Sequence, residues 1–393
     1  MSGQKKKGIS GEGLLLVVVV LFWFALYLHI PYQTPFLTAA GVAAGFTGTI
    51  VGAYGITQLV FRLPLGVLAD YAGKHKIFVI LGAGLAGFAC LVRILVPTGP
   101  GFLAANLISG CAASMWIAYM VLYSNYFSKK EQQKATSKVI MACNLGMCLA
   151  FVFSSCFYEK MGMAFLCGAG VIAGIAGVIG GIFVKEDLIP MKGKGEKRPG
   201  IGTYLSVCGN KRLILFALLA LIQQGIQMAT AMSFTTQILE DMGASALFIG
   251  SASIFYMIAA VVSAQFASTD LCEKKGARFY VPLVFFLTAV YCILVPAVGN
   301  IYAIFILQAF PGMSTGILLS YLTSESMKEI PREKSSTAMG FFQAVYAVGM
   351  AFFPWAVGVL TENFNIGTGY DFLASAAFIG TVVSVIYYRR QQN

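Results

Sequence analysis

The chain alternates between long apolar runs and short polar breaks. Runs such as LLLVVVVLFWFALYLHI and AFLCGAGVIAGIAGVIGGIFV have about the length, roughly 20 residues, that a helix needs to cross the hydrocarbon core of a bilayer. They are unlike the short alternating segments of a membrane β-barrel. Marking such runs predicts twelve transmembrane helices, at residues 13–37, 46–70, 77–96, 100–127, 139–158, 162–184, 213–238, 246–269, 279–297, 300–325, 337–361 and 370–388. The pattern therefore predicts an all-α integral membrane protein.

One hydrophilic segment divides the predicted helices six and six. Residues 185–212, KEDLIPMKGKGEKRPGIGTYLSVCGNKR, are rich in lysine, glycine and proline, which is typical of a linker on a membrane surface. The sequence thus predicts an N-terminal six-helix bundle at 1–184, a cytoplasmic linker at 185–212 and a C-terminal six-helix bundle at 213–393.

Composition agrees with a membrane protein and excludes other classes. Of the residues in the chain, 58% are hydrophobic and only 11% are charged, whereas about a quarter of the residues in a soluble domain are charged. It has no phosphate-binding Gly-Lys-Ser/Thr loop, no nucleophile–base–acid set and no zinc-like Cys or His spacing. We therefore expect no enzyme, no cofactor, no metal and no ATP-driven step.

The net charge of +11 is distributed as membrane topology requires, which argues against nucleic acid as a partner. If the N-terminus is cytoplasmic, 24 of the 27 lysines and arginines fall in cytoplasmic segments. Positive residues are retained on the cytoplasmic side of membrane proteins. Both termini are therefore predicted to be cytoplasmic.

The two halves resemble each other at an offset of 202 residues. The matching pairs include Gly41/Gly243, Ala44/Ala246, Tyr54/Tyr256, Gly110/Gly312 and Tyr119/Tyr321. Parallel repeats of six helices, with a binding site between them, are a transporter architecture. The sequence predicts two pseudo-symmetric bundles.

The stretch GVLADYAGKHK, after the second predicted helix, resembles the signature loop of the major facilitator superfamily. Its matching residues are Gly66, Leu68, Asp70, Gly73, Lys74 and Lys76, and His75 stands at a usually basic position. The resemblance implies a prokaryotic secondary transporter of the twelve-helix type, in which this loop is a conformational latch. The latch residues are then Gly66, Asp70, Gly73, Lys74 and Lys76.

Elementary physics supports the same roles. Gly66 allows close helix approach, Gly73 allows a tight reversal, and Asp70 can accept hydrogen bonds from a partner helix. The alternative is that these charges only set topology. In the second half, TDLCEKKGAR keeps Asp270, Gly276 and Arg278, which predicts a weaker latch.

The resemblance also implies a central cavity lined by helices one, four, seven and ten. The candidate substrate contacts are Trp23, Tyr27, Asn106, Tyr119, Gln224, Gln227 and Gln308. Pro31, Pro35 and Pro311 are expected to kink helices one and ten. Each polar residue has the alternative role of holding helices together.

Arg62 adds a charged candidate within the second helix. A buried arginine usually marks a transport pathway or a fixed partner. One interpretation is a guanidinium that binds an anionic substrate, and the other is a brace for the cytoplasmic gate. RLPLG resembles the second helix of nitrate/nitrite porters, but their Gly-rich signatures are only partly present here.

No acid is predicted at mid-membrane, where proton-coupled drug antiporters of the superfamily usually carry one. His29 is the one mid-span candidate for proton coupling, and a packing role is its alternative.

We therefore predict a secondary active or facilitative transporter of a small organic solute, anionic or neutral, that works by alternating access. The alternatives are a proton-coupled multidrug-type exporter and a non-transporting receptor or scaffold. The expected partners are the solute, the lipid bilayer and a coupling proton, and the expected state is a monomer in the prokaryotic plasma (inner) membrane.

Overall fold

The computed structural model describes residues 11–42, 44–186 and 201–391. Half of the predicted linker, residues 187–200, lies outside the described residues. Within them the chain forms helices and no β-strand.

The first half contains six membrane crossings. They are α1 (Gly11–Tyr27) with α2 (Ile30–Ala39), α3 (Ala44–Ala72), α4 (Lys76–Leu95), α5 (Gly99–Ser114) with α6 (Trp116–Asn125), and α7 (Gln132–Phe183), which follows the short η1 (Lys129–Glu131). Helix α7 is 52 residues long, but Gly162 interrupts it at φ 73° and ψ −179°. Gly162 therefore divides α7 into the fifth and sixth crossings.

The second half repeats this arrangement. After α8 (Ile201–Leu205) and η2 (Ser206–Gly209), the crossings are α9 (Lys211–Ala229) with η3 (Thr230–Phe234) and α10 (Thr235–Asp241), α11 (Ala246–Ala267), α12 (Asp270–Ala297), α13 (Ile301–Leu307) with α14 (Ala309–Met313), η4 (Ser314–Leu318) and α15 (Leu319–Met327), then α16 (Ser335–Asn363) after η5 (Arg332–Lys334), and α17 (Ile366–Arg390). With α7 counted twice, eleven apolar helical segments give twelve crossings. The prediction of twelve helices is confirmed.

One predicted helix start is wrong. The fifth crossing begins at Gln132 instead of 139. Helix α12 is interrupted at Gly276 (φ 66°, ψ −174°), so the ninth crossing begins directly after this glycine, close to the predicted 279. Hydropathy detects only the apolar part of a helix, whereas the fifth crossing begins in polar sequence. The Thr269 side chain accepts a hydrogen bond from the amide of Cys272 and so caps the start of α12.

The repeat is visible in backbone geometry. Gly41 and Gly243 both have positive φ, at 76° and 80°. A Cβ on Gly110 would lie 2.5 Å from the carbonyl oxygen of Tyr54, and one on Gly312 would lie 3.0 Å from that of Tyr256. Matching glycines thus allow matching close contacts between helices, as expected for two pseudo-symmetric bundles.

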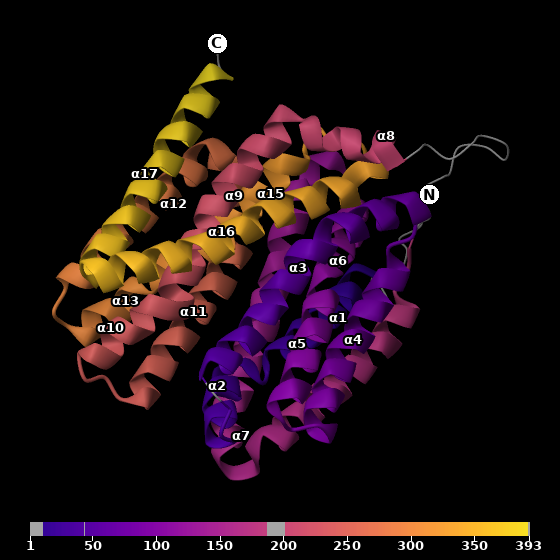
Figure 1. Cartoon of the computed structure of the whole chain (residues 1–393). Helices are drawn as coiled ribbons and strands as arrows, with labels where there is room; N and C mark the ends of the chain where they lie inside the picture. The colour runs from indigo at the N-terminus through magenta and orange to yellow at the C-terminus, as the bar shows by residue number, and fades with distance from the viewer. Residues whose placement is uncertain (1–10, 43, 187–200, 392–393) are drawn as a thin grey trace.

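The halves meet near the end of the molecule that carries both chain termini and diverge toward the other end (Figure 1). We call these the terminal end and the opposite end. The terminal end contains the loops at residues 73–75, 126–131, 268–269 and 328–334. Helix α3 packs against α16 there, and α7 packs against α11 and α15.

Candidate substrate site and gate

Four of the twelve crossings are interrupted: the first, fourth, seventh and tenth. The first breaks between α1 and α2, and the fourth breaks at Met115. The seventh and tenth contain the π-helices η3 and η4, and π-helices occur frequently at functional sites. Proline explains two of the breaks, because it has no N–H to donate to the carbonyl four residues earlier. Pro31 leaves the carbonyl of Tyr27 without this hydrogen bond, and Pro311 leaves that of Leu307 without it.

The interruptions recur at the repeat offset. Thr230, the first residue of η3, lies 202 positions after Leu28 in the break of the first crossing. Ile317 in η4 lies 202 positions after Met115. The four helices predicted to line a central cavity are thus the four that depart from regular α-helix.

Aromatic side chains gather on the first and fourth crossings. The ring of Trp23 lies 5.5 Å from Tyr27 and 5.3 Å from Trp116, centroid to centroid. The indole N–H of Trp23 is buried and has no acceptor among the described residues. This cluster offers an apolar surface with an unused hydrogen-bond donor.

Polar side chains gather on the seventh, eighth and tenth crossings. Gln227 donates to the Tyr256 hydroxyl over 2.6 Å, and Tyr256 shares a 2.8 Å hydrogen bond with Thr315 of η4. Gln223 donates to Ser314 over 3.3 Å, and its carbonyl oxygen has no partner among the described residues. Gln224, also predicted as a contact, is 8% exposed on the same helix.

The two clusters converge near Cys143 of α7. Cys143 belongs to the same buried cluster as Trp23 and Trp116 of the first half and Tyr256 and Tyr346 of the second, and Tyr27 packs against this cluster. The aromatic surface and the amide–hydroxyl surface therefore adjoin one buried cluster that both halves share.

Three other predicted contacts lie inside single bundles. Tyr119 is fully buried and donates to the carbonyl of Val79 over 2.7 Å. Asn106 binds Arg93 and donates to the carbonyl of Ile50 over 2.7 Å. Gln308 is 1% exposed and accepts a long, 3.5 Å hydrogen bond from Tyr291. In this conformation none of the three belongs to the surfaces that meet at Cys143.

Arg62 joins the two halves. Its guanidinium donates to the backbone carbonyl of Gln343 on α16 over 3.0 Å, and also to the side chain of Gln58. It lies 4.9 Å from the ring centroid of Tyr346, in cation–π range. These contacts fit the gate-brace interpretation of Arg62.

His29 lies in the break between α1 and α2 and is 3% exposed. Its Nδ1 has no hydrogen-bond partner among the described residues. Arg93 is the charged group that acts on it, so a proton on His29 would face a like charge.

Asp70 binds the start of α16. Its Oδ1 accepts from the amide of Ser336 over 2.9 Å, and its Oδ2 accepts from the amide of Thr337 over 2.6 Å. The first amides of a helix lack partners within the helix and carry a partial positive charge, so a carboxylate there is well placed. A single side chain of the first half thus caps a helix of the second.

His75 extends this contact to the end of α7. Its Nε2 lies 2.8 Å from the Ser336 hydroxyl, and its Nδ1 lies 3.2 Å from Glu186. Burial would raise the pKa of Glu186, but hydrogen bonds from the His75 side chain and from the His75 and Lys76 amides leave its pKa below the usual value. Lys76 donates to the carbonyl of Ile182 over 2.6 Å.

Two glycines allow α3 and α16 to touch. A Cβ on Gly66 would lie 3.0 Å from the carbonyl carbon of Ser336, and closer still to its oxygen. From the other side, a Cβ on Gly340 would lie 2.7 Å from the carbonyl oxygen of Arg62. Gly73 turns the chain at φ 65°, and Lys74 beside it is exposed.

The corresponding contact of the second half is more exposed. Asp270 lies 2.5 Å from Lys134 at the start of α7, and Glu273 lies 3.2 Å from it. The Asp270 side chain is 82% exposed, whereas Asp70 is 7% exposed. Exposed ion pairs contribute little, so the second-half contact is the weaker of the two.

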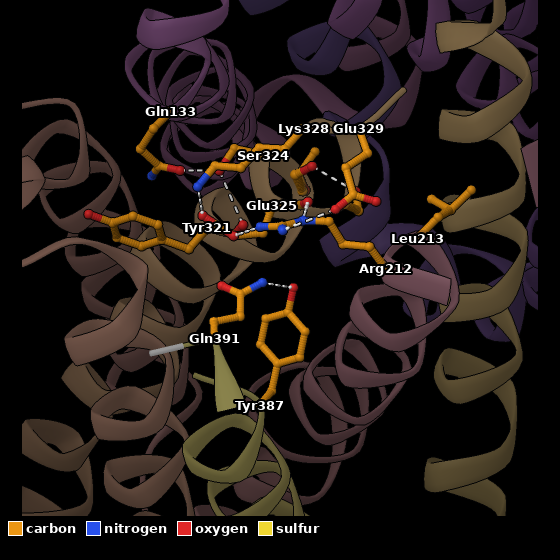
Figure 2. A network of polar contacts seen from close by, with 12 residues as sticks. Gln133, Arg212, Leu213, Tyr321, Ser324, Glu325, Lys328, Glu329, Tyr387 and Gln391 are labelled. Carbon is orange, nitrogen blue, oxygen red and sulfur yellow. Dashed lines mark hydrogen bonds and ion pairs between the residues drawn. The ribbon is translucent and has the colours of Figure 1, made fainter. Parts of the chain in front are cut away.

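A charged network supports the terminal end of the second half (Figure 2). Glu325 of α15 is 3% exposed and pairs with Arg212 of α9 and with Lys328. Arg212 also donates from Nε to the Glu325 carbonyl over 2.7 Å. Next to it, Ser324 donates to Gln133 of α7, which links the network to the first half.

Sequence reasoning missed several of these residues. The cap partners Ser336 and Thr337 and the Arg212–Glu325 pair belong to no local motif. His75 lies in the signature loop, but the loop sequence does not show that it bridges Ser336 and Glu186. Opposite charges at span ends were the available signal for Arg212 and Glu325, but they do not specify a partner. Among the described residues no cluster of three or more His, Cys, Asp or Glu could hold a metal ion.

A family model described as Major Facilitator Superfamily matches residues 15–354 and 216–392. The chain belongs to the major facilitator superfamily. It is therefore a multi-span membrane transporter and not an enzyme. A similar relative is the "Proton-coupled antiporter flippase LtaA" of Staphylococcus saprophyticus subsp. saprophyticus, at 23% identity over 97% of this chain and 95% of the relative.

Solved structures of the superfamily share the fold. The human organic anion transporter MFSD10 (TETRAN) superposes with a TM-score of 0.83 at 12% identity, over 95% of this chain and 98% of that one. A structure of the Escherichia coli fucose:proton symporter FucP superposes with a TM-score of 0.79 at 14% identity, over 96% and 98%. At such identities the likeness shows the fold alone.

Proposed function

We propose that this chain is a secondary active or facilitative transporter that works by alternating access, described here with the gate at its terminal end closed. The observation that carries the proposal is the capping of α16 by Asp70. A buried carboxylate of one half holds the helix start of the other, and this contact must break if the terminal end is to open.

The moving bodies in this proposal are the two halves, at 1–184 and 213–393, joined by residues 185–212. The terminal end is the cytoplasmic side of a prokaryotic plasma membrane, because the topology predicted from the sequence puts 24 of the 27 basic residues on the cytoplasmic side. The chain functions as a monomer.

The substrate in this proposal is a small organic solute, neutral or anionic, with an apolar part. The aromatic cluster around Trp23 would contact the apolar part, and the amides and hydroxyls around Gln227 would bind polar groups. The residues that form these two surfaces include no carboxylate, which disfavours a cationic substrate. The fold neighbour MFSD10 is an organic anion transporter, in agreement with this class.

A second candidate function is proton-coupled antiport of a larger amphipathic molecule or drug. Two observations favour it. The relative LtaA is named a proton-coupled antiporter flippase and matches 97% of this chain. Arg62, which first suggested an anionic substrate, is engaged with Gln343 of the opposite half.

A ligand screen on two tryptophan variants tests the proposed site. Organic carboxylates, neutral sugars and lipophilic cations would be compared by thermal shift on the purified protein. Trp23→Leu should weaken the best ligand on the order of 10-fold or more, because a buried aromatic contact contributes about 0.5–1.5 kcal/mol beyond its buried area. Trp355→Leu is the matched control, since Trp355 is 63% exposed on α16.

The outcomes separate the hypotheses. A carboxylate or sugar that binds the wild type and loses affinity only in Trp23→Leu supports the proposed substrate class. A lipophilic cation as best ligand favours the antiporter. Equal effects of the two variants would place the substrate elsewhere.

A further inference from the structure

Arg93 is a deeply buried charge of the first half that lies outside the two surfaces around Cys143. It is 2% exposed near the end of α4. One guanidinium nitrogen donates to Asn106 over 2.6 Å and to Ser109 over 3.0 Å. Its Nε and Nη1 have no oxygen or nitrogen partner among the described residues.

The charge of Arg93 has no counter-ion in the part of the chain that the structure describes. No Asp or Glu there forms an ion pair with it. Its other polar neighbours are the thiols of Cys90 and Cys167, which are weak acceptors. Leaving an arginine unpaired inside a membrane protein is costly, and such residues usually mark a pathway or a ligand.

Arg62 provides the contrast. Its guanidinium binds a backbone carbonyl and a side-chain oxygen and lies over a tyrosine ring, so most of its donor capacity is used within the protein. Arg93 lies 5.9 Å from the ring centroid of Phe102, and two of its three nitrogens have no oxygen or nitrogen partner among the described residues, against one nitrogen of Arg62. Arg93 therefore has more unused hydrogen-bond donors than Arg62.

The position of Arg93 suits a ligand that enters from the opposite end. Counting from Lys76, Arg93 lies about 26 Å along α4 from the terminal end. Asn106 lies roughly 10 Å into the bundle from the start of α5 at Gly99. The guanidinium thus reaches from the end of α4 back into the bundle, where it contacts Asn106.

That break supplies a second unpartnered group. His29 occupies it and has a buried Nδ1 without a partner among the described residues. About one turn before Arg93, the Cys90 thiol of α4 donates to the carbonyl of Ala25 of α1 over 3.3 Å, and Ala25 lies about one turn before His29. Transporters use discontinuous helices to present backbone and side-chain groups to charged substrates. Two buried polar side chains from different helices therefore have unused hydrogen-bonding capacity in one place.

We infer that Arg93 and His29 form a binding site for an oxyanion, a carboxylate or phosphate group, in the part of the first half toward the opposite end, where Asn106 and Ser109 hold the guanidinium in place. The oxyanion is the acidic group of the transported solute. The assignment of this oxyanion to the transported solute rests on the proposed function, whereas the binding site itself does not.

The test uses the purified full-length protein with benzoate and inorganic phosphate as probes, by equilibrium dialysis and thermal shift. Arg93→Gln should weaken probe binding by about 10–100-fold, the worth of a charge-assisted hydrogen bond. Arg93→Lys should recover part of this loss, because it keeps the charge but not the planar donor. Arg389→Gln, at an exposed arginine near the end of α17, is the matched control and should bind as the wild type does.

Asn106→Asp keeps the test decisive if Arg93→Gln fails to fold. The new carboxylate would pair with Arg93 and compete with the probe, so binding should fall while the charge stays buried. Wild-type binding in both variants, or no probe binding in the wild type, would overturn the site. Binding of phosphate but not benzoate would overturn the assignment to an organic solute.

Transport separates this inference from the proposed function. A protein that transports its solute normally with Arg93→Gln would refute the substrate role of the site and leave alternating access intact. A protein that binds benzoate through Arg93 but moves no solute would refute the proposed function alone.

Discussion

Replacing Asp70 by Asn removes the charge from the latch and keeps nearly the same side-chain shape. In the closed gate the two carboxylate oxygens accept from the amides of Ser336 and Thr337, over 2.9 and 2.6 Å. The asparagine side chain has only one acceptor oxygen. Its NH₂ group would face the second backbone N–H, and two donors cannot form a hydrogen bond with each other. One hydrogen bond is lost, and the other becomes a neutral one.

The magnitude follows from these contacts. A hydrogen bond to a charged group contributes about 1.5–3 kcal/mol, and a charge at a helix start about 0.3–1 kcal/mol or more when partly buried. Asp70 is only 7% exposed, so water screens little of this. We expect the closed gate to lose about 2–4 kcal/mol relative to the open one, a shift of roughly 30–1000-fold in their ratio.

The assay combines conformation and transport. Labels at the exposed residues Lys74 and Glu333, on either side of the latch, would report the gate distance by double electron–electron resonance. Asp70→Asn should broaden and lengthen this distance and slow transport in proteoliposomes, with expression and substrate binding largely unchanged. Asp371→Asn, at an exposed acid on α17, is the control. A wild-type transport rate and distance distribution in Asp70→Asn would refute the latch.

Two further substitutions act on the same contact between α3 and α16. Gly66→Ala should open the gate and slow transport, because its Cβ would collide with the Ser336 carbonyl, whereas Gly55→Ala on the same helix meets nothing within 4 Å and should be neutral. Arg62→Gln should change turnover and leave substrate affinity nearly unchanged, because its guanidinium binds Gln343 of the other half.

The same distance measurement checks Gly66→Ala, and equal behaviour of the two alanine variants would contradict the close-approach argument. For Arg62→Gln, binding and initial-rate measurements are compared. A loss of about 1.5–3 kcal/mol in the binding of an anionic substrate would return Arg62 to the substrate site.

Much of the site region could be predicted from local sequence. The GVLADYAGKHK loop predicted Asp70 and Gly66 as latch residues, and the structure places both at the contact between the halves. Pro31 and Pro311 predicted interruptions in helices one and ten. The interruptions of the fourth and seventh crossings contain no proline and were not predicted. A helix interruption caused by proline can be predicted from the sequence, because proline lacks the backbone N–H. The position of a π-helix depends on how the helix packs against its neighbours, which the sequence does not show.

The substrate surface was less predictable, because rotation of a helix about its axis decides which polar residue faces which neighbour. In a soluble helix the apolar stripe fixes that rotation, but in a membrane helix the lipid-facing and the packed faces are both apolar. Tyr119 and Gln308 were therefore indistinguishable from Tyr27 and Gln227 in sequence. Only the structure shows that Tyr119 and Gln308 are hydrogen-bonded inside single bundles. It also shows that Tyr27 packs against a buried cluster shared by both halves, to which Tyr256, the partner of Gln227, belongs.

The sequence by itself determined the twelve crossings, the two-fold repeat, the latch loop and the superfamily, because each depends on runs, spacings or local motifs. Tertiary structure decided the partners. Asp70 finds amides 266 and 267 positions away, Arg62 finds a carbonyl 281 positions away, and Arg93 finds no acid among the described residues. The two arginines look alike in an apolar run, but one is bound to the opposite half and the other keeps donors without an oxygen or nitrogen partner there. The partners of a buried charge are set by which helices pack together, and that is a property of the folded chain.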